Sequence, residues 1–184
     1  MPDIILTLIL DGDVAVGKTC IRTQFIDKKF NPELLLTLGA DFGIKSIEID
    51  SLDINYHIWD LSGNRRFDKV KETYYQGVHG IILVYDCTSY ESLVNIIDRI
   101  EFIKQNVEKD QVYIMIAGNK VDLKDSIKVK EVHVNKILNK LKNMIPDNFS
   151  LYPSYLEVSA KTGKNVEELF FEFGKFMIKT YEFN

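Results

Sequence analysis

The stretch Gly12-Asp13-Val14-Ala15-Val16-Gly17-Lys18-Thr19 fits the pattern G-x-x-x-x-G-K-[ST] of a phosphate-binding loop. An apolar run over residues 4–10 predicts a buried strand before it, and a helix is predicted after it, over residues 17–27. Glycines let successive backbone N–H groups face one anion, and the start of the following helix adds its positive end. Lys18 would reach the β- and γ-phosphates, and the Thr19 hydroxyl would bind Mg²⁺. The loop by itself fits GTPases, ATPases and kinases equally.

Outward from this loop, short apolar runs alternate with helical patterns, which predicts an α/β fold with a mostly parallel sheet. Residues 80–85 and 111–117 are nearly continuous apolar runs, as expected of central strands covered on both faces. Residues 40–50 and 52–60 partly alternate instead. This pattern predicts an antiparallel hairpin at a sheet edge, with its turn at Asp50-Ser51. A short last strand is predicted over residues 155–158.

Apolar residues at helical spacing predict further helices over residues 92–107 and 129–141. A last helix is predicted to begin at Asn165 as its N-cap. Its apolar stripe consists of Val166, Leu169, Phe170, Phe173 and Met177. Core packing explains this stripe better than a partner-binding face does. With 184 residues, the chain is long enough for one well-buried core, and we expect a single domain over residues 1–184.

The composition argues against several classes of protein. The formal net charge is −4, so no basic footprint indicates DNA or RNA as a partner. Cys20 and Cys87 are far apart in sequence and match no metal-ligand spacing, which fits a reducing compartment. No segment is long and apolar enough to span a bilayer, and the apolar start lacks the basic flank of a secretory signal. We therefore expect a cytoplasmic protein.

Two further loops indicate which nucleotide base the site recognises. Asn119-Lys120-Val121-Asp122 directly follows one apolar strand, and Ser159-Ala160-Lys161 follows the last predicted strand. In this order after the phosphate loop, they resemble the N-K-x-D and S-A-K loops of the Ras superfamily of small GTPases. The resemblance spans essentially the whole chain and is greatest to Rab-like members. It implies that the Asp122 carboxylate accepts hydrogen bonds from the guanine N1–H and amine, which adenine lacks. Asn119 would fix the loop, the Lys120 stem would cover the base, and the Ala160 N–H would meet the guanine oxygen.

The resemblance also implies a fold and a set of contacts. The fold is a P-loop NTPase G domain, with a six-stranded, mostly parallel sheet, one antiparallel edge strand and about five helices on both faces. The ligands are GTP or GDP with Mg²⁺. Nucleotide contacts are expected from Asp13, Val14, Ala15, Val16, Gly17, Lys18, Thr19, Cys20, Phe30, Thr37, Gly63, Asn119, Lys120, Asp122, Ser159, Ala160 and Lys161.

Two segments resemble the switches of the family. Asp60-Leu61-Ser62-Gly63 is similar to D-x-x-G, which implies that Asp60 holds Mg²⁺ through water and that the Gly63 N–H meets the γ-phosphate. Thr37, in the stretch 30–37, would coordinate Mg²⁺ only with the triphosphate, and Phe30 would pack against the guanine ring. The resemblance then implies a switch between ordered and disordered segments. The γ-phosphate and Mg²⁺ would hold both segments in place, and hydrolysis would release them.

Residues 38–42, Leu-Gly-Ala-Asp-Phe, resemble a Rab-type stretch. Phe42, Trp59 and Tyr74 occupy the positions of an aromatic triad that Rab-like proteins present to effectors. Simple packing remains the alternative for each of these side chains.

The chain departs from the pattern where hydrolysis is concerned. We expect catalysis to rest on Lys18, Thr37, Gly63 and Asn64. The family usually has Gln in place of Asn64, and a misplacement of roughly 1 Å can cost about 100-fold in rate. Val14, where Ras proteins carry Gly, would crowd the position of an arginine finger. Leu34 replaces a tyrosine that often covers the nucleotide. These differences predict slow hydrolysis; Arg65 or Arg66 could compensate, although a solvated turn explains both arginines better.

Two features outside the motifs also depart from the family. The sequence ends without a cysteine, so no site for a lipid anchor is visible in this chain; a truncated chain and a protein that never carries a lipid both fit this ending. The interval from Asp122 to Ser159 is 37 positions (159 − 122), longer than usual. We place the excess in a loop over residues 143–154, bracketed by Pro146 and Pro153.

The leading interpretation is a GTP/GDP switch. We expect it to be a monomer and to contact effector, exchange-factor and GTPase-activating proteins through its switch segments. The alternative is a pseudo-GTPase, which binds guanine nucleotide without significant turnover; Val14 and Asn64 favour it. A nucleoside or nucleotide kinase would need an arginine-rich lid and an acceptor pocket, which the loop pattern does not supply.

Overall fold

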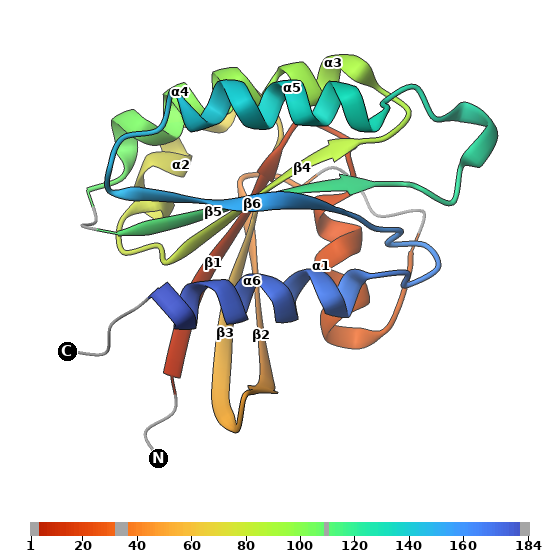
Figure 1. Cartoon of the computed structure of the whole chain (residues 1–184). Coiled ribbons are helices and arrows are strands. Elements are labelled where there is room, and N and C mark those ends of the chain that lie inside the picture. The colour runs from red at the N-terminus through yellow and green to blue at the C-terminus, as the bar shows by residue number, and fades with distance from the viewer. Residues whose placement is uncertain (1–3, 32–36, 109–110, 181–184) are drawn as a thin grey trace.

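A six-stranded sheet runs through the molecule in the order β2-β3-β1-β4-β5-β6, with helices on both faces (Figure 1). The structure is a computed structural model and describes residues 4–31, 37–108 and 111–180. The strands are β1 (Ile4–Gly12), β2 (Ala40–Ile49), β3 (Leu52–Leu61), β4 (Gly80–Asp86), β5 (Val112–Asn119) and β6 (Phe149–Glu157). Only the β2–β3 pair within this sheet is antiparallel. The predicted sheet, with its antiparallel edge strand, is confirmed.

The helices are α1 (Lys18–Asp27), α2 (Asp68–Tyr75), α3 (Tyr90–Val94), α4 (Ile96–Asn106), α5 (Glu131–Lys142) and α6 (Val166–Thr180), with the 3₁₀ turns η1 (Arg65–Phe67) and η2 (Lys124–Ser126). Asn95 alone separates α3 from α4, and its backbone is helical (φ −64°, ψ −13°). The described residues therefore form five helical segments, as predicted. Across the ranges that the structure describes, none of these helices has the length and apolar content to cross a membrane.

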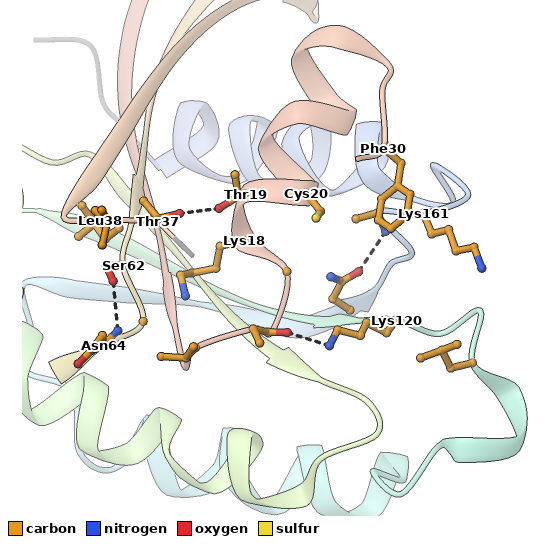
Figure 2. A pocket seen from close by; sticks show the side chains of 18 of the residues that line it. Lys18, Thr19, Cys20, Phe30, Thr37, Leu38, Ser62, Asn64, Lys120 and Lys161 are labelled. Atoms are coloured by element: carbon orange, nitrogen blue, oxygen red, sulfur yellow. Dashed lines mark hydrogen bonds between the residues drawn. The ribbon is translucent and has the colours of Figure 1, made fainter. Parts of the chain in front are cut away.

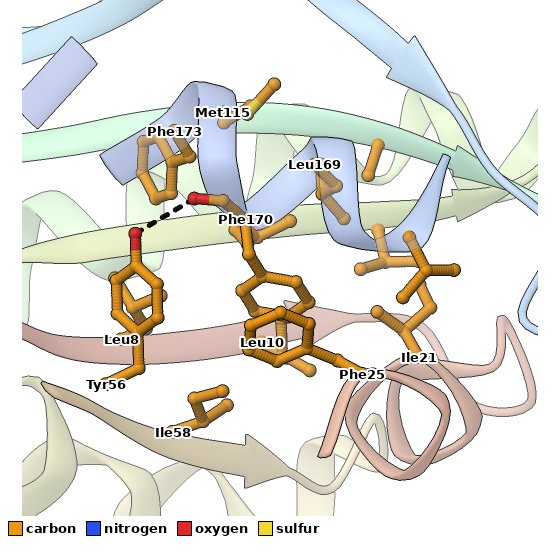
Figure 3. Packing of buried hydrophobic residues seen from close by; sticks show 14 of the residues in the cluster. Leu8, Leu10, Ile21, Phe25, Tyr56, Ile58, Met115, Leu169, Phe170 and Phe173 are labelled. Carbon is orange, nitrogen blue, oxygen red and sulfur yellow. Dashed lines mark hydrogen bonds between the residues drawn. The ribbon is translucent and has the colours of Figure 1, made fainter. Parts of the chain in front are cut away.

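The two faces of the sheet each bury an apolar cluster. Helices α1 and α6 cover one face, and α2, α3, α4 and α5 cover the other (Figure 1). On the first face the rings of Phe25 and Phe170 stack with centroids 3.8 Å apart (Figure 3). The hydroxyl of Tyr56 on β3 donates to the carbonyl of Phe170 at 2.9 Å. The stripe predicted for the last helix is therefore core, as expected.

The hairpin turn follows from its two residues. Asp50 and Ser51 have φ of 50° and 66°, and Ile49 pairs with Leu52 across the turn. Two successive left-handed residues match the twist of the flanking strands, which is the geometry that closes two-residue hairpins. The predicted hairpin is confirmed at this turn.

The last strand is longer than predicted. β6 begins at Phe149, six positions before the expected start at 155 (155 − 149), so much of the loop expected over 143–154 is strand. Pro153 lies within it, where the β5–β6 register shifts between Ile114 and Ile116. A proline is tolerated in a strand at an edge or a bulge, and β6 provides both. The expectation that Pro153 bounds a loop was wrong.

Candidate functional site

A cavity of about 640 Å³ opens at the carboxyl ends of the parallel strands (Figure 2). Loops after β1, β3, β5 and β6 meet there, because the carboxyl ends of parallel strands share one edge of the sheet. Of the residues predicted for the site, those that line the cavity are Val14, Ala15, Gly17, Lys18, Thr19, Cys20, Phe30, Thr37, Gly63, Asn64, Asn119, Lys120, Asp122, Ala160 and Lys161. The volume lies within the range of ordinary small-molecule sites.

Four predicted residues stand behind this lining. Asp13 and Val16 contribute backbone carbonyls that accept from the side chains of Lys18 and Asn119, respectively. Asp60 is fully buried, and Ser159 is 1% exposed. Both act on residues of the lining rather than on the open space, as the contacts below describe.

The phosphate loop curls around the ammonium group of Lys18. Its Nζ donates to the carbonyls of Gly12 at 2.8 Å and Asp13 at 2.7 Å. Ala15 and Gly17 have φ of 62° and 96°, so left-handed residues interrupt the loop backbone. This conformation turns successive N–H groups toward one concave site. Burial lowers the pKa of Lys18 to about 8, against the opposing effect of nearby carboxylates. An incoming polyphosphate would restore the charge.

Three oxygen-bearing side chains converge beside Lys18. The hydroxyls of Thr19 and Thr37 lie 2.8 Å apart, and both donate to Asp60 Oδ2, Thr37 at 3.3 Å. Asp60 Oδ1 is buried without a hydrogen-bond partner among the described residues. Burial raises the pKa of Asp60, so a carboxylate here lacks compensation. Hard oxygen ligands and an uncompensated buried oxygen fit Mg²⁺, which would supply a charge to hold phosphate oxygens.

The base end of the cavity is organised by Asn119. Its Nδ2 donates to the Val16 carbonyl at 2.9 Å, and its Oδ1 accepts from the Ala160 N–H at 3.1 Å. A side chain at Gly17 would overlap this amide, so glycine is required there by space as well as by its positive φ. The base-side and phosphate-side loops are therefore one connected unit.

Other contacts orient the remaining base-side residues. The Ser159 hydroxyl donates to Asp122 Oδ1 at 2.6 Å. Lys120 Nζ donates to the Ala15 carbonyl at 2.8 Å and pairs with Asp86 Oδ2 at 2.6 Å. Phe30 and Lys161 lie together at the rim of this end (Figure 2). Lys120, Phe30, Lys161 and Asp122 thus surround one end of the cavity.

The segments predicted as switches meet each other and the phosphate loop. The Ser62 N–H donates to the Gly39 carbonyl at 2.8 Å, which joins the two segments. A Cβ at Gly63 would overlap the backbone of Asp13 and Val14, so this glycine lies directly on the phosphate loop. The predicted departure at Leu34 lies outside the described residues, as does the rest of 32–36.

Asn64 lines the cavity, but its side chain is engaged elsewhere. Asn64 Oδ1 accepts from the Arg66 N–H at 3.0 Å and caps η1. Arg65 pairs with Asp98 on the surface, with the Arg65 side chain 62% exposed, as expected of a solvated turn. Val14 is 44% exposed, and its branched side chain faces the cavity.

The three aromatic residues expected to face effectors do come together. The ring centroids of Phe42 and Trp59 are 4.6 Å apart, and those of Trp59 and Tyr74 are 4.7 Å apart. Phe42 is 38% exposed, and the other two are partly buried. The triad thus packs against itself and still leaves apolar surface in solvent.

Some residues of the site were not predicted. Leu38, Leu61, Ser62, Phe67 and Leu123 also line the cavity. Asp86, the ion-pair partner of Lys120, ends β4. Its place directly after a buried strand was a usable signal, because strand ends meet at the ligand edge of such sheets.

The comparisons with known proteins agree with this geometry. A model of the Ras family matches residues 7–179, and the chain belongs to that family of small GTP-binding switch proteins. It is similar to the human Ras-related protein Rab-8B, with 38% identity over 169 residues, 92% of this chain and 76% of the relative. It is also similar to the Ras-related protein SEC4 of Candida albicans, at 35% over 170 residues with the same coverage. SEC4 of Saccharomyces cerevisiae is 32% identical over 182 residues, 99% of this chain and 79% of the relative. The chain is therefore Rab-like within its family.

Proposed function

We propose that this chain binds GTP and GDP with Mg²⁺ in the described cavity and switches its partners through the segments around Thr37 and Gly63. One observation carries the proposal: the Asn119 side chain joins the phosphate loop at Val16 to the base loop at Ala160. A single ligand with a base at one end and phosphates at the other spans those two loops. The Ser159 hydroxyl on Asp122 leaves the carboxylate aimed at donors on the base edge.

Magnesium ion would be held by the Thr19 and Thr37 hydroxyls and, through water, by Asp60. The Thr37 hydroxyl lies beside Thr19, and Gly63 lies on the phosphate loop; each position would have to be held by an ordered segment. Both conditions favour a ligand with a γ-phosphate, which is how the nucleotide would set the shape that partners recognise. Effector, exchange-factor and GTPase-activating proteins would contact this surface, with Phe42, Trp59 and Tyr74 as its apolar part.

Hydrolysis within this proposal is slow. The oxygen of Asn64 that would orient the attacking water instead caps η1 through the Arg66 N–H. Val14 adds bulk at the same side of the cavity. The same observations favour the second candidate, a pseudo-GTPase that keeps its nucleotide without turnover. Single-turnover hydrolysis of loaded GTP separates the two, because a switch consumes it over hours and a pseudo-GTPase leaves it intact.

The base-reading role of Asp122 gives the sharpest test of the proposal. Guanine offers two donors to this carboxylate, whereas xanthine replaces the amine by a carbonyl that an amide can satisfy. We expect Asp122→Asn to weaken GTP binding by about 100-fold or more and to gain affinity for xanthosine triphosphate, since an unpaired buried polar group costs heavily. Titration calorimetry with both nucleotides and with ATP measures this.

Asp125→Asn is the matched control. Asp125 lies three residues on, in η2, and is exposed, so its substitution removes the same charge without touching the cavity. It should leave the preference for GTP unchanged. A wild-type chain that binds ATP as tightly as GTP, or an Asp122→Asn chain with wild-type affinity for GTP, would refute the proposed function.

A further inference from the structure

A second set of charged side chains lies beneath the phosphate loop. Asp11 is the last residue but one of β1 and is fully buried, and the side chains of Lys71 on α2 and Arg99 on α4 are 1% and 5% exposed. Charged groups are seldom buried to this extent without specific partners, because taking them out of water is costly. Their partners therefore indicate what the arrangement holds in place.

Arg99 joins the second switch segment to the phosphate loop. Its Nη2 donates to the Gly63 carbonyl at 2.6 Å and to Asp13 Oδ1 at 3.3 Å. Its Nη1 lies 3.5 Å from Asp11 Oδ1. One guanidinium thus contacts three groups from β1, the phosphate loop and the segment after β3. A planar fork of donors suits such a junction better than a single ammonium does.

The acidic partners of Arg99 are themselves fixed. The Tyr75 hydroxyl donates to Asp11 Oδ2 at 2.6 Å, and the Asn95 amide donates to Asp13 Oδ2 at 2.6 Å. Lys71 lies 2.9 Å from Asp68 Oδ1 and 4.0 Å from Asp11 Oδ1. Helix α2 is therefore attached to the base of the phosphate loop through the Lys71 ammonium group and the Tyr75 hydroxyl.

This junction acts on the glycine that would meet the γ-phosphate. Gly63 lies on the backbone of Asp13 and Val14, and Arg99 fixes its carbonyl from the other side. All the contacting groups belong to the chain, so they favour this position of Gly63 in addition to any contact with a γ-phosphate. Ordering Gly63 in advance reduces the entropy that a triphosphate must overcome on binding, while a diphosphate gains nothing from it.

We propose that Arg99 is a positioning residue that holds Gly63 on the phosphate loop and so raises the preference of this chain for GTP over GDP. The inference rests on the proposed function, since it assigns Gly63 to the γ-phosphate. Arg99 does not line the cavity described above; it lines an adjoining hollow that also contains Asp13, Val14 and Gly63.

The test compares dissociation constants for GDP and for the non-hydrolysable β,γ-imido analogue of GTP, both with Mg²⁺. Arg99→Gln removes the fork, and Arg99→Lys keeps the charge near Asp11 but cannot reach all three partners. We expect the ratio of analogue to GDP dissociation constants to rise about tenfold in Arg99→Gln, with a smaller rise in Arg99→Lys. Lys104→Gln is the matched control, because Lys104 is on the same helix and, among the described residues, pairs with its neighbour Glu101.

The outcomes are separable. Equal weakening of both nucleotides, or an unchanged ratio in whichever Arg99 variant folds, overturns the positioning role, because a merely structural residue affects both ligands alike. If the wild-type chain binds no guanine nucleotide, the proposed function fails instead. Amide exchange with the analogue bound gives a second readout: Gly63 and Asn64 should exchange faster in Arg99→Gln than in the wild-type chain, and at the wild-type rate in Lys104→Gln. Equal rates in Arg99→Gln and the wild-type chain would also overturn the inference.

Discussion

Asn64 is a residue whose side chain has a structural use that competes with a catalytic one. Its oxygen caps η1, so it is not available to a water molecule in the cavity. Glutamine caps poorly, and its extra methylene moves the amide further into the cavity. We therefore expect the geometry at this position to limit how fast the chain hydrolyses GTP.

Asn64→Gln should therefore speed hydrolysis. We expect single-turnover GTP hydrolysis to rise by about tenfold to 100-fold, the range that a misplacement near 1 Å can cost. Asn64→Ala is the control, since it frees the cap without supplying an amide and should not accelerate the reaction. An equal gain in both variants would show that release of the cap, and not the new amide, is responsible.

Lys18 gives the site a pH dependence. Because burial lowers its pKa to about 8, the free protein loses the Lys18 charge as pH rises through 8, whereas bound phosphates favour the charged form. Affinity for GDP should be level below about pH 7 and fall by up to about tenfold per pH unit above 8. Calorimetry from pH 6.5 to 9.5 measures this. Lys18→Arg binds with a charge that does not titrate there, so it should lack the fall. A wild-type affinity flat to pH 9.5 would contradict the shifted pKa.

At the residue scale, the motifs predicted most of the cavity lining but not the junction beneath it. The sequence identifies the glycines, Lys18, Thr19 and Asp122, because a phosphate loop and a base loop need those residue types at fixed spacing. The burial of Asp11, Lys71 and Arg99 could not be predicted in this way. A charged residue is ordinarily exposed, and the sequence around each of them does not show that it is buried against a charged partner from another element.

Among the elements, α6 shows how an aromatic stripe and one glycine dock a helix. Phe170 stacks on Phe25, and the Tyr56 hydroxyl holds the Phe170 carbonyl. A Cβ at Gly174 would overlap the same hydroxyl and the end of Ile49 (Figure 3 shows Tyr56 and Phe170). The close approach of the helix to β3 thus depends on a missing side chain.

Gly174→Ala should destabilise the protein even though alanine favours a helix by about 1 kcal/mol over glycine. We expect a loss of about 1–3 kcal/mol in the free energy of unfolding, as for other overpacked sites. Tyr56→Phe alone should cost about 1 kcal/mol, for the lost hydrogen bond. Urea unfolding of the double variant should show a loss smaller than the sum, because the hydroxyl in the way is gone. Strict additivity would contradict the proposed overlap.

The errors in the predicted elements have physical reasons. Helix α2 buries Lys71 and Tyr75, so it shows no apolar stripe and no helix was assigned to residues 68–75. β6 was cut short because its proline was taken as a boundary, whereas a bulge on an edge strand accommodates it. By contrast, β1, β4 and β5 were placed within one or two residues at each end, because burial on both faces leaves continuous apolar runs.

For the whole molecule, the strand order places the site. From β1 the sheet grows one way through β3 and β2, and from β4 it grows the other way through β5 and β6. Such a change of direction leaves a crevice at the carboxyl ends of the two central strands, and both the phosphate loop and Asp86 lie there. The buried charges of the junction lie under the same crevice, so they bear on global stability.

Acid should unfold the chain partly through Asp11. Burial alone would raise the pKa of Asp11, but Arg99 and Lys71 outweigh it and hold the pKa below the ordinary 3.8. A depressed carboxyl pKa contributes stability that is fully present above the unfolded value and is lost as pH falls below it toward the folded value. Urea midpoints should therefore drop between about pH 4 and pH 2. The drop should be shallower in Asp11→Asn, and parallel curves would contradict this assignment.

The proline in β6 also bears on how copies of this chain meet. An exposed strand edge invites another strand to pair with it, which is a common route to fibres and swapped assemblies. Pro153 has no N–H to offer, and the register shift around it bends the ladder, so the β6 border is a poor template for such growth. The opposite border, β2, carries no proline between Ala40 and Ile49. Any unwanted sheet-to-sheet polymerisation of this chain should therefore start from β2.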